Sequence, residues 1–183
     1  MQPRVRLREA TRSDAGLLEL WQSPDFRGEF NDFGLPVPSG APALREHSVV
    51  DDDRGGLIVE LVADATPIGS VSWHGVHYGP NPQSLAWNIG INLIPAARGQ
   101  GYGGEAQRLL AERLFATTTV NRVEAMTDVD NVPEQRALEK AGFVREGVAR
   151  GAQFRAGAWH DILVYSVLRD APSLLRPPPP SME

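Results

Sequence analysis

The sequence predicts a single α+β domain, and three observations lead to this prediction. The chain has 183 residues, which is within the usual range for one domain, and 42% of them are apolar, enough for a core. Segments with strand-like alternation are mixed with segments of helical spacing, without a repeat of fixed period. Neighbouring strand segments are joined by short turns, which favours hairpins over a purely parallel sheet.

The N-terminal part is expected to hold a strand, a helix and an irregular segment. "RVRLREAT" (4–11) alternates apolar and charged residues, which is typical of a strand. "TRSDAGLLELW" (11–21) has apolar residues at helical spacing after Thr11, a good N-cap residue. "SPDFRGEFNDFGLPVPSGAP" (23–42) has no clean period and reads as a long loop or broken helix, and loops of this length are often functional.

The middle of the chain predicts a hairpin and a further strand. "GGLIVELVAD" (55–64) and "PIGSVSWHGVHY" (67–78) are strand-like segments joined by a short turn. The three acids of 51–53 are expected to form a solvated turn before this hairpin. "SLAWNIGINLIP" (84–95) predicts another strand, which Pro95 ends.

The C-terminal half predicts two helices and three strands. The helices are "EAQRLLAERLFATT" (105–118) and "NVPEQRALEKAGF" (131–143), separated by the short strand "RVEAMTDV" (122–129). Residues 143–169 predict a long closing hairpin. We expect the domain to cover 1–171 and to be followed by a Pro-rich tail over 172–183, since proline fits neither a helix interior nor a central strand.

Composition excludes several classes of function. The formal net charge is −5 and no basic stripe is present, so no nucleic-acid partner is expected. The sequence lacks a run of about 18 apolar residues and an apolar N-terminal signal, so neither a membrane partner nor secretion is expected. The chain has no cysteine, which excludes disulfides, thiolate zinc sites and a cysteine nucleophile. We therefore expect a cytoplasmic protein without a metal site.

The stretch "ARGQGYGGEA" (97–106) is the strongest functional motif. It has four glycines between a predicted strand and a predicted helix, where free backbone N–H groups and the helix dipole favour a phosphate. Gly103-Gly104-Glu105 lacks the Lys and Ser or Thr of a P-loop, which argues against a nucleotide triphosphatase. The spacing G-x-G-x-G-G and the hairpins before it also argue against the dinucleotide-binding fingerprint.

The stretch from Arg98 to Gly103 resembles the pyrophosphate-binding motif of the GNAT superfamily of N-acetyltransferases, which is Arg or Gln, two residues, Gly, one residue, then Gly or Ala. "GINLIPAARGQGYGGEAQRLL" (90–110), "NVPEQRALEKAGFVREGVAR" (131–150) and "WHDILVYSVLR" (159–169) resemble its RimJ/RimL-like branch, which includes ribosomal-protein alanine acetyltransferases. The resemblance implies the GNAT fold: a mixed, mostly antiparallel sheet with splayed parallel strands at its centre and flanking helices.

This resemblance also implies a cosubstrate, an activity and a binding site. The cosubstrate is acetyl-CoA, and its acetyl group passes to a primary amine, of a protein N-terminus or a small molecule, by direct attack in a ternary complex. The enzyme is expected to be a monomer or a homodimer. In this family, the strand before the glycine-rich stretch carries a bulge that frees backbone groups for the cosubstrate. The positions implied for cosubstrate binding are Asn92, Leu93, Ile94, Arg98, Gly99, Gln100, Gly101, Tyr102, Gly103, Gly104 and Asn131.

The usual acid and base of such enzymes are not visible. Asn88 stands where many relatives have a glutamate base, Leu138 where many have a tyrosine acid, and Glu134 where the branch often has a serine. An amide cannot take up a proton at neutral pH. Three sources of proton transfer stay open: a water relay, the acids of the irregular segment, or a histidine near the end of a strand. The corresponding candidates are Glu29 and Asp32, and His74 and His77.

Two simpler interpretations stand beside these functional ones. Asn131 and Glu134 have the spacing of a reciprocal capping pair, which alone explains both residues. The missing acid and base also fit a CoA-binding sensor or scaffold module without turnover.

Overall fold

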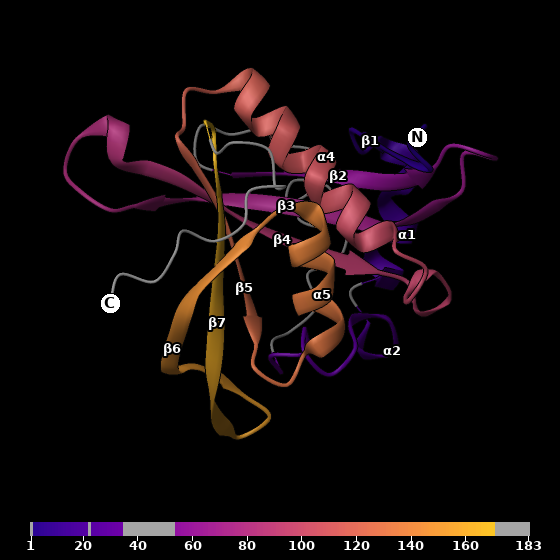
Figure 1. The fold of residues 1–183 in the computed structure, drawn as a ribbon. Coiled ribbons are helices and arrows are strands. Elements are labelled where there is room, and N and C mark those ends of the chain that lie inside the picture. Colours follow the sequence, from indigo (N-terminus) through magenta and orange to yellow (C-terminus); the bar gives the residue numbers. More distant parts are fainter. Residues whose placement is uncertain (1, 22, 35–53, 171–183) are drawn as a thin grey trace.

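The computed structural model describes residues 2–21, 23–34 and 54–170 (Figure 1). The acids of 51–53, most of the second half of the irregular segment and the expected Pro-rich tail lie outside the described residues. The strands are β1 (Val5–Arg8), β2 (Arg54–Leu61), β3 (Pro67–His77), β4 (Leu85–Leu93), β5 (Arg122–Asp128), β6 (Val144–Arg155) and β7 (Ala158–Leu168). The α-helices are α1 (Ala15–Trp21), α2 (Pro24–Arg27), α4 (Tyr102–Thr117) and α5 (Val132–Ala141).

The described strands form one seven-stranded sheet in the order β1-β2-β3-β4-β5-β7-β6. All neighbouring strands are antiparallel except β4 and β5, which are parallel and lie in the middle of the sheet. The predicted hairpins β2–β3 and β6–β7 are confirmed. The expectation of a mixed, mostly antiparallel sheet in an α+β domain is therefore correct.

The two parallel strands separate toward their carboxyl ends. They pair only over Trp87–Ile89 and Val123–Ala125. Beyond this point β4 stays paired with β3, and β5 stays paired with β7. The Ile94 N–H donates to the Ile68 carbonyl of β3 at 2.9 Å. Because backbone groups alternate sides along a strand, those of Ile91 and Leu93 point into the opening between β4 and β5.

The expected bulge near the end of β4 does not occur. The pairing of β3 with β4 runs without a register shift from Gly69–Leu93 to His77–Leu85. The free backbone groups of β4 come from the loss of its other neighbour, β5. The backbone groups at the end of β4 are therefore exposed without a bulge.

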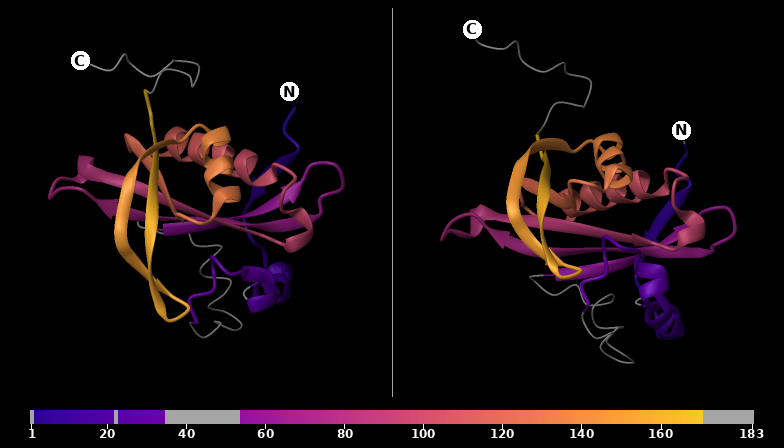
Figure 2. Two further views of the ribbon diagram at one scale, coloured as in Figure 1. Left: turned by 60° about the horizontal axis from the view of Figure 1, so that its bottom comes forward. Right: turned by 90° about the horizontal axis from the view of Figure 1, so that it is seen from below.

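Helices cover both faces of the sheet, with α4 and α5 on one face and α1 and α2 on the other (Figure 2). The main core lies under α4 and α5 and includes Leu110, Leu114, Val123, Leu138 and Tyr165, all almost fully buried. A smaller cluster under α1 joins Leu18 and Trp21 to Ile58 of β2. Among the described residues, no helix is long and apolar enough to span a membrane.

Local sequence explains where α4 begins and where α5 begins and ends. Gly101, with φ of 83°, is the N-cap of α4, so the helix starts before the expected Glu105. Pro133 lies in the first turn of α5, where a missing N–H costs nothing. Gly142, with φ of 102°, ends α5 in the left-handed region, as its glycine predicts.

Candidate functional site

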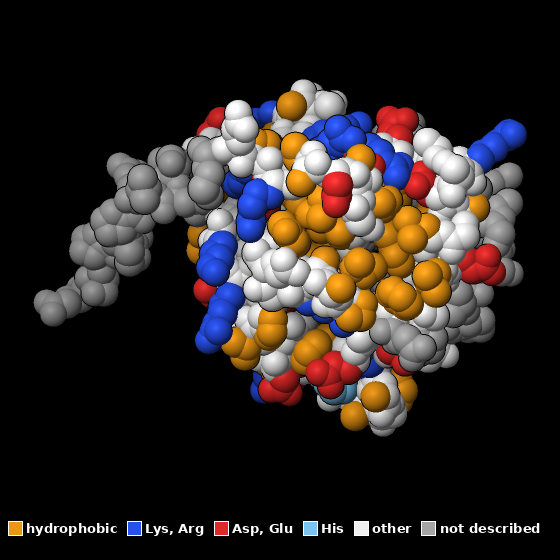
Figure 3. Space-filling view, turned by 90° about the vertical axis from the view of Figure 1, so that its right-hand side faces the viewer, with side chains coloured by type: hydrophobic (Ala, Val, Ile, Leu, Met, Phe, Trp, Pro, Cys, Tyr) orange, Lys and Arg blue, Asp and Glu red, His pale blue; other side chains and the backbone are white. Residues whose placement is uncertain are grey.

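A cavity of about 640 Å³ opens where β4 and β5 separate. Its walls are the end of β4, the glycine loop (98–104), one side of α5 and the segment 27–31, which begins at the last residue of α2. The glycine loop and the start of α4 lie at the right of Figure 1, on the side that Figure 3 faces. On that face, hydrophobic side chains gather at the centre and Lys and Arg side chains lie along one margin (Figure 3).

Two glycines of the glycine loop need their backbone freedom. Gly99 and Gly101 have φ of 72° and 83°, a left-handed conformation that costs other residues energy. A Cβ at Gly99 would meet nothing within 4 Å, and one at Gly101 would meet only the end of Arg4. The backbone is therefore open to the cavity at the N-terminus of a 16-residue helix, where N–H groups favour an anion.

The other two glycines have different surroundings. A Cβ at Gly104 would lie 2.9 Å from the Ala137 carbonyl oxygen of α5. Gly104 therefore lets α4 and α5 approach each other. A Cβ at Gly103 would lie 3.7 Å from Leu93 and 3.8 Å from Ile91, which are ordinary contacts. Close helix packing thus explains Gly104, and exposure to the cavity is what Gly99, Gly101 and Gly103 share.

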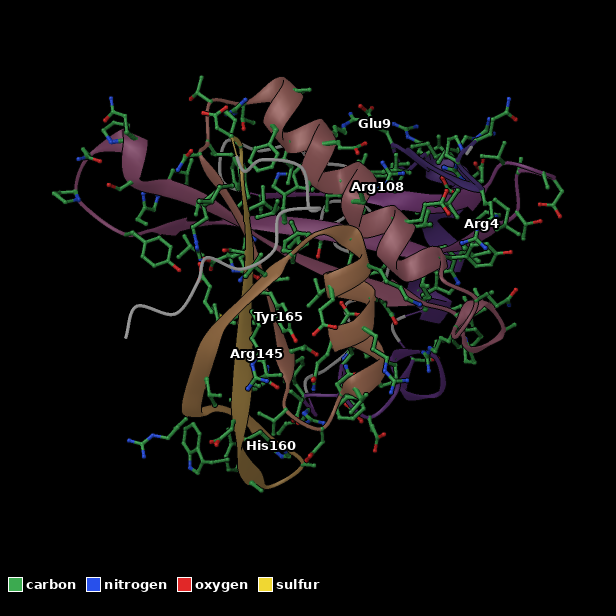
Figure 4. The ribbon with its side chains drawn as sticks, in the orientation of Figure 1. Arg4, Glu9, Arg108, Arg145, His160 and Tyr165 are labelled. Carbon is green, nitrogen blue, oxygen red and sulfur yellow. The ribbon has the colours of Figure 1, made fainter. Side chains whose placement is uncertain are left out.

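Arg4, just before β1, fixes the outer side of the glycine loop (Figure 4). Its Nε donates to the Glu105 carboxylate at 3.1 Å and its Nη1 donates to the Gln100 carbonyl at 3.2 Å. Its guanidinium also lies over the Tyr102 ring, 4.9 Å from the ring centre. The Gln100 side chain donates to the Ala96 carbonyl. The side chains of Gln100 and Tyr102 are thus engaged outside the cavity wall.

Arg98 joins the glycine loop to the N-terminal segment. Its Nε donates to the Leu93 carbonyl at 2.9 Å, and its Nη2 donates to the Phe26 carbonyl. A Cβ at Gly28 would lie 3.0 Å from the Arg98 Nη1. Arg98 thereby holds the segment 27–31 against the end of β4 and completes the cavity wall.

The cavity carries an excess of positive side chains. The basic residues that line it are Arg27, Arg98, Arg136 and Lys140. The acidic residues that line it are Glu29 and Glu134. A cleft lined mainly by one sign of charge attracts ligands of the opposite sign. Together with the open glycines, this charge fits a ligand that carries phosphates.

The structure brings most of the predicted cosubstrate residues to one place. Those that line the cavity are Asn92, Leu93, Arg98, Gly99, Gly101, Gly103, Gly104 and Asn131. Ile94 packs against the hydrophobic core instead. The Asn92 amide donates to the Trp21 carbonyl at 3.3 Å, so this side chain ties β4 to α1.

The proposed proton-transfer residues are placed differently from one another. Glu29 lines the cavity. Asp32 is outside the cavity wall and accepts a hydrogen bond from the Gly34 N–H at 3.0 Å. His74 and His77 are exposed on β3, and neither lines the cavity. Glu29 is thus the one of these four that the cavity contains.

The position of the missing glutamate base is part of a buried network. The Asn88 amide donates to Glu124 of β5 at 3.2 Å. The same fully buried carboxylate accepts from the Tyr78 hydroxyl at 2.6 Å and from the Arg122 Nε at 2.9 Å. Sequence reasoning missed Glu124, although an acid within an otherwise strand-like run was a signal. Its oxygens are satisfied by three donors, which suits a structural role.

Glu134 is the other acid that sequence reasoning undervalued. Asn131 accepts a hydrogen bond from the Glu134 N–H at 3.4 Å, but the Asn131 N–H donates to the Asp128 carbonyl. The expected reciprocal capping pair is therefore only half formed. Glu134 lines the cavity, and burial raises the pKa of its carboxyl to about 7, although the nearby Gln107 side chain acts in the opposite direction.

A charged cluster links the β6–β7 hairpin to the segment 27–31. Arg155, at the end of β6, is buried and donates to the Asp128 carboxylate through Nη2 and to the Glu29 carbonyl through Nη1. The His160 Nδ1 lies 3.0 Å from the Asp128 carboxylate, and His160 is near the hairpin tip (Figure 4). The Arg155 guanidinium also lies over the Phe30 ring. This cluster supports the wall that carries Glu29.

Comparison with known families agrees with this geometry. The family model described as "Acetyltransferase (GNAT) domain" matches residues 4–144. A protein described as a probable N-acetyltransferase, YjcK of Bacillus subtilis, is 39% identical over 170 residues. The alignment covers 90% of this chain and 92% of that protein. The similarity therefore extends over nearly the full length of both.

Solved structures show the same fold. The chain resembles RimL, a ribosomal L7/L12 α-N-protein acetyltransferase in complex with coenzyme A, with a TM-score of 0.74 and 18% identity. It also resembles spermidine N-acetyltransferase from Vibrio cholerae in complex with CoA and spermine, with a TM-score of 0.74 and 19% identity. Each match covers 91% of this chain, with 95% of the first structure and 96% of the second.

Proposed function

The chain belongs to the acetyltransferase (GNAT) family, and we propose that it transfers an acetyl group from acetyl-CoA to a primary amine. One observation carries this proposal. The central parallel strands separate over a positively lined cavity, and an open glycine loop at a helix N-terminus closes one end of it. Such a cavity suits an elongated ligand with a polyanionic end.

The chain offers groups of the right kind for each part of acetyl-CoA. The N–H groups of the glycine loop suit the pyrophosphate. The backbone groups of Ile91 and the N–H of Leu93, which β5 does not pair, suit the amides of the pantetheine arm, because unpaired strand groups seek partners. Arg136 and Lys140 add positive charge to the same cavity. The bound thioester supplies the activated acetyl group.

The opposite wall suits the acceptor. The segment 27–31 brings Glu29 to the cavity, and a carboxylate attracts a cationic amine. Arg155 holds this wall through the Glu29 carbonyl and not through the Glu29 carboxylate. We propose direct attack of the neutral amine on the thioester, since positioning of the two reactants alone accounts for much of a transfer rate. The acceptor is either a protein N-terminus or a small-molecule amine.

The second candidate function is a CoA-binding sensor or scaffold. The observation that favours it is that Asn88 is engaged by Glu124 and that Leu138 is fully buried in the core. Neither of these positions can exchange a proton with a substrate. This candidate predicts the same cosubstrate affinity without turnover.

One experiment separates the two functions. The purified protein is incubated with acetyl-CoA and a panel of polyamines, small primary amines and peptides with free N-termini, and release of free thiol is followed. Affinity for CoA is measured in parallel by calorimetry. The transferase predicts thiol release that depends on at least one acceptor. Measurable CoA affinity without release above the uncatalysed rate would support the sensor instead.

The remaining expectations from the sequence stay predictions. We propose a cytoplasmic enzyme that acts as a monomer or a homodimer, without nucleic-acid or membrane partners and without a metal ion. Size-exclusion chromatography with light scattering tests the oligomeric state directly.

A further inference from the structure

The Glu134 carboxyl does not cap the helix on which it lies. The spacing Asn131-x-x-Glu134 predicts that the glutamate caps α5, but the Asn131 N–H is already bonded to the Asp128 carbonyl at 3.0 Å. The side chain instead lines the cavity. It is therefore available to a ligand.

The surroundings of Glu134 contain a neutral partner and no ion pair. On α4, the buried Gln107 amide donates to the Gly103 carbonyl at 3.3 Å, and its side chain lies near enough to Glu134 to oppose the rise of the carboxyl pKa. Among the described residues, no Lys, Arg or His nitrogen lies within ion-pair distance of it. The other charged groups that line the cavity are Arg27, Glu29, Arg98, Arg136 and Lys140. A carboxyl group desolvated without a cation favours its protonated form.

Glu134 and Glu29 lie on different walls of the cavity. Glu134 belongs to α5 and lines the cavity together with Asn131. Helix α5 lies with α4 on one face of the sheet (Figure 2). Glu29 comes from the segment after α2, on the side of the opposite face. With the phosphates at the glycine loop, a thioester beside α5 would face Glu134, and an acceptor beside the segment 27–31 would face Glu29.

We propose that Glu134 is the general acid of the reaction, and that it donates its proton to the sulfur of the departing thiolate. This inference rests on the proposed function. In the step, a C–N bond forms between amine and acetyl carbon, and the C–S bond breaks with its electron pair on sulfur. The O–H bond of Glu134 breaks as the S–H bond forms. The proton lost by nitrogen passes to water, and water returns a proton to the Glu134 carboxylate.

The acid strength of Glu134 suits this task. Burial raises its pKa to about 7, so a large share of the molecules hold the proton near neutral pH. General acids work best when their pKa is close to the working pH. Position 134, where the RimJ/RimL-like branch often has a serine, thus carries a carboxyl group that can supply the proton.

The first test compares Glu134→Gln with Glu139→Gln, an exposed glutamate of the same helix that lies outside the cavity wall. We expect Glu134→Gln to lower kcat by about 10²-fold or more, with the Kd for CoA changed less than about twofold. The pH profile of kcat is measured for each protein. In the native protein, kcat should fall as pH rises through about 7, because Glu134 loses its proton there. This descending limb of the profile should be missing in Glu134→Gln. Glu139→Gln should keep both kcat and the limb.

The second test reads the contact with sulfur without turnover. Free CoA is bound to the protein, and its thiol is titrated by the ultraviolet absorbance of the thiolate. A Glu134 carboxylate beside the sulfur raises the thiol pKa, so the bound thiol should titrate at lower pH in Glu134→Gln than in the native protein. Equal titration in the two proteins would show that Glu134 does not face the sulfur and would overturn the assignment.

The outcomes also separate this inference from the proposed function. Thiol release by the native protein with an unchanged kcat in Glu134→Gln overturns the general acid and leaves the transferase intact. Absence of release by the native protein with every acceptor overturns the transferase and the acid together. A loss of kcat in Glu134→Gln that is explained by a matching loss of CoA affinity also overturns the acid.

Discussion

Gly99 and Gly157 have similar backbones in different places. Their φ values are 72° and 81°, and a Cβ at either would meet nothing within 4 Å. Gly99 lines the cavity, whereas Gly157 lies in the β6–β7 turn. The pair therefore separates backbone strain from ligand contact.

We predict that Gly99→Val and Gly157→Val each cost about 1–2 kcal/mol of unfolding free energy, because both force a branched residue into the left-handed region. Only Gly99→Val should weaken CoA binding, by about tenfold or more, which corresponds to about 1.4 kcal/mol. Calorimetric titration with CoA checks the affinity and thermal unfolding checks the strain. Equal CoA affinity in the two variants would contradict the role of the glycine loop.

Glu134 predicts a pH-dependent stability. Its pKa is raised by burial to about 7 in the folded protein, so between about pH 4.5 and 7 the folded state holds a proton that the unfolded state has lost. The free energy of unfolding due to this group therefore falls as pH rises through that range. Glutamine does not titrate. Glu134→Gln should match the native protein near about pH 4 and exceed its melting temperature near about pH 8.

Thermal unfolding of both proteins across this pH range checks the prediction, and Glu139→Gln serves as the control on the same helix. A difference between Glu134→Gln and the native protein that does not change with pH would show that burial of the carboxyl is not its cause. The expected gain in stability and loss of activity would make Glu134 a residue kept for function.

At the scale of elements, the packing of α4 on α5 depends on one glycine. We predict that Gly104→Ala costs about 1–3 kcal/mol, because its Cβ would lie 2.9 Å from the Ala137 carbonyl oxygen. Gly103→Ala should keep or raise stability, since its Cβ makes ordinary contacts and alanine is the better helix former. Urea denaturation measures both. A smaller loss for Gly104→Ala than for Gly103→Ala would contradict the close helix contact.

Buried Arg155 joins the β6–β7 hairpin to Asp128 of β5 and to the Glu29 carbonyl of the N-terminal segment. We predict that Asp128→Asn costs about 3–5 kcal/mol, because it leaves the buried Arg155 without its carboxylate. Asp130→Asn, an exposed neighbour, is the matched control and should change stability by less than about 0.5 kcal/mol. Denaturant unfolding gives both values, and similar losses in the two variants would refute the role of the cluster.

At the scale of the whole molecule, most elements could be predicted from local patterns. The alternation in β1 and the helical spacing of α5, with Pro133 and Gly142 at its ends, are set by neighbours in sequence. The start of α4 was predicted three residues late, because Gly103 and Gly104 are poor helix formers and their packing against α5 and β4 is a tertiary effect.

The site was predictable where it depends on a motif and not where it depends on packing. The glycine loop could be located from its spacing. The half-formed cap of Glu134 could not be foreseen, because the Asn131 N–H donates to the Asp128 carbonyl at the end of β5. The link of Arg155 to Asp128 and Glu29 joins segments far apart in the chain, and no local pattern records it.

The central claim is acetyl transfer from acetyl-CoA to an amine in this cavity. The most direct measurement counts free CoA thiol and N-acetylated amine in the same reaction, by thiol titration and by mass spectrometry. The account predicts equal amounts of the two products, both dependent on the acceptor, retained in Gly157→Val and lost in Gly99→Val at low acetyl-CoA. Thiol release without acetylated amine, or equal yields in the two glycine variants, would contradict it.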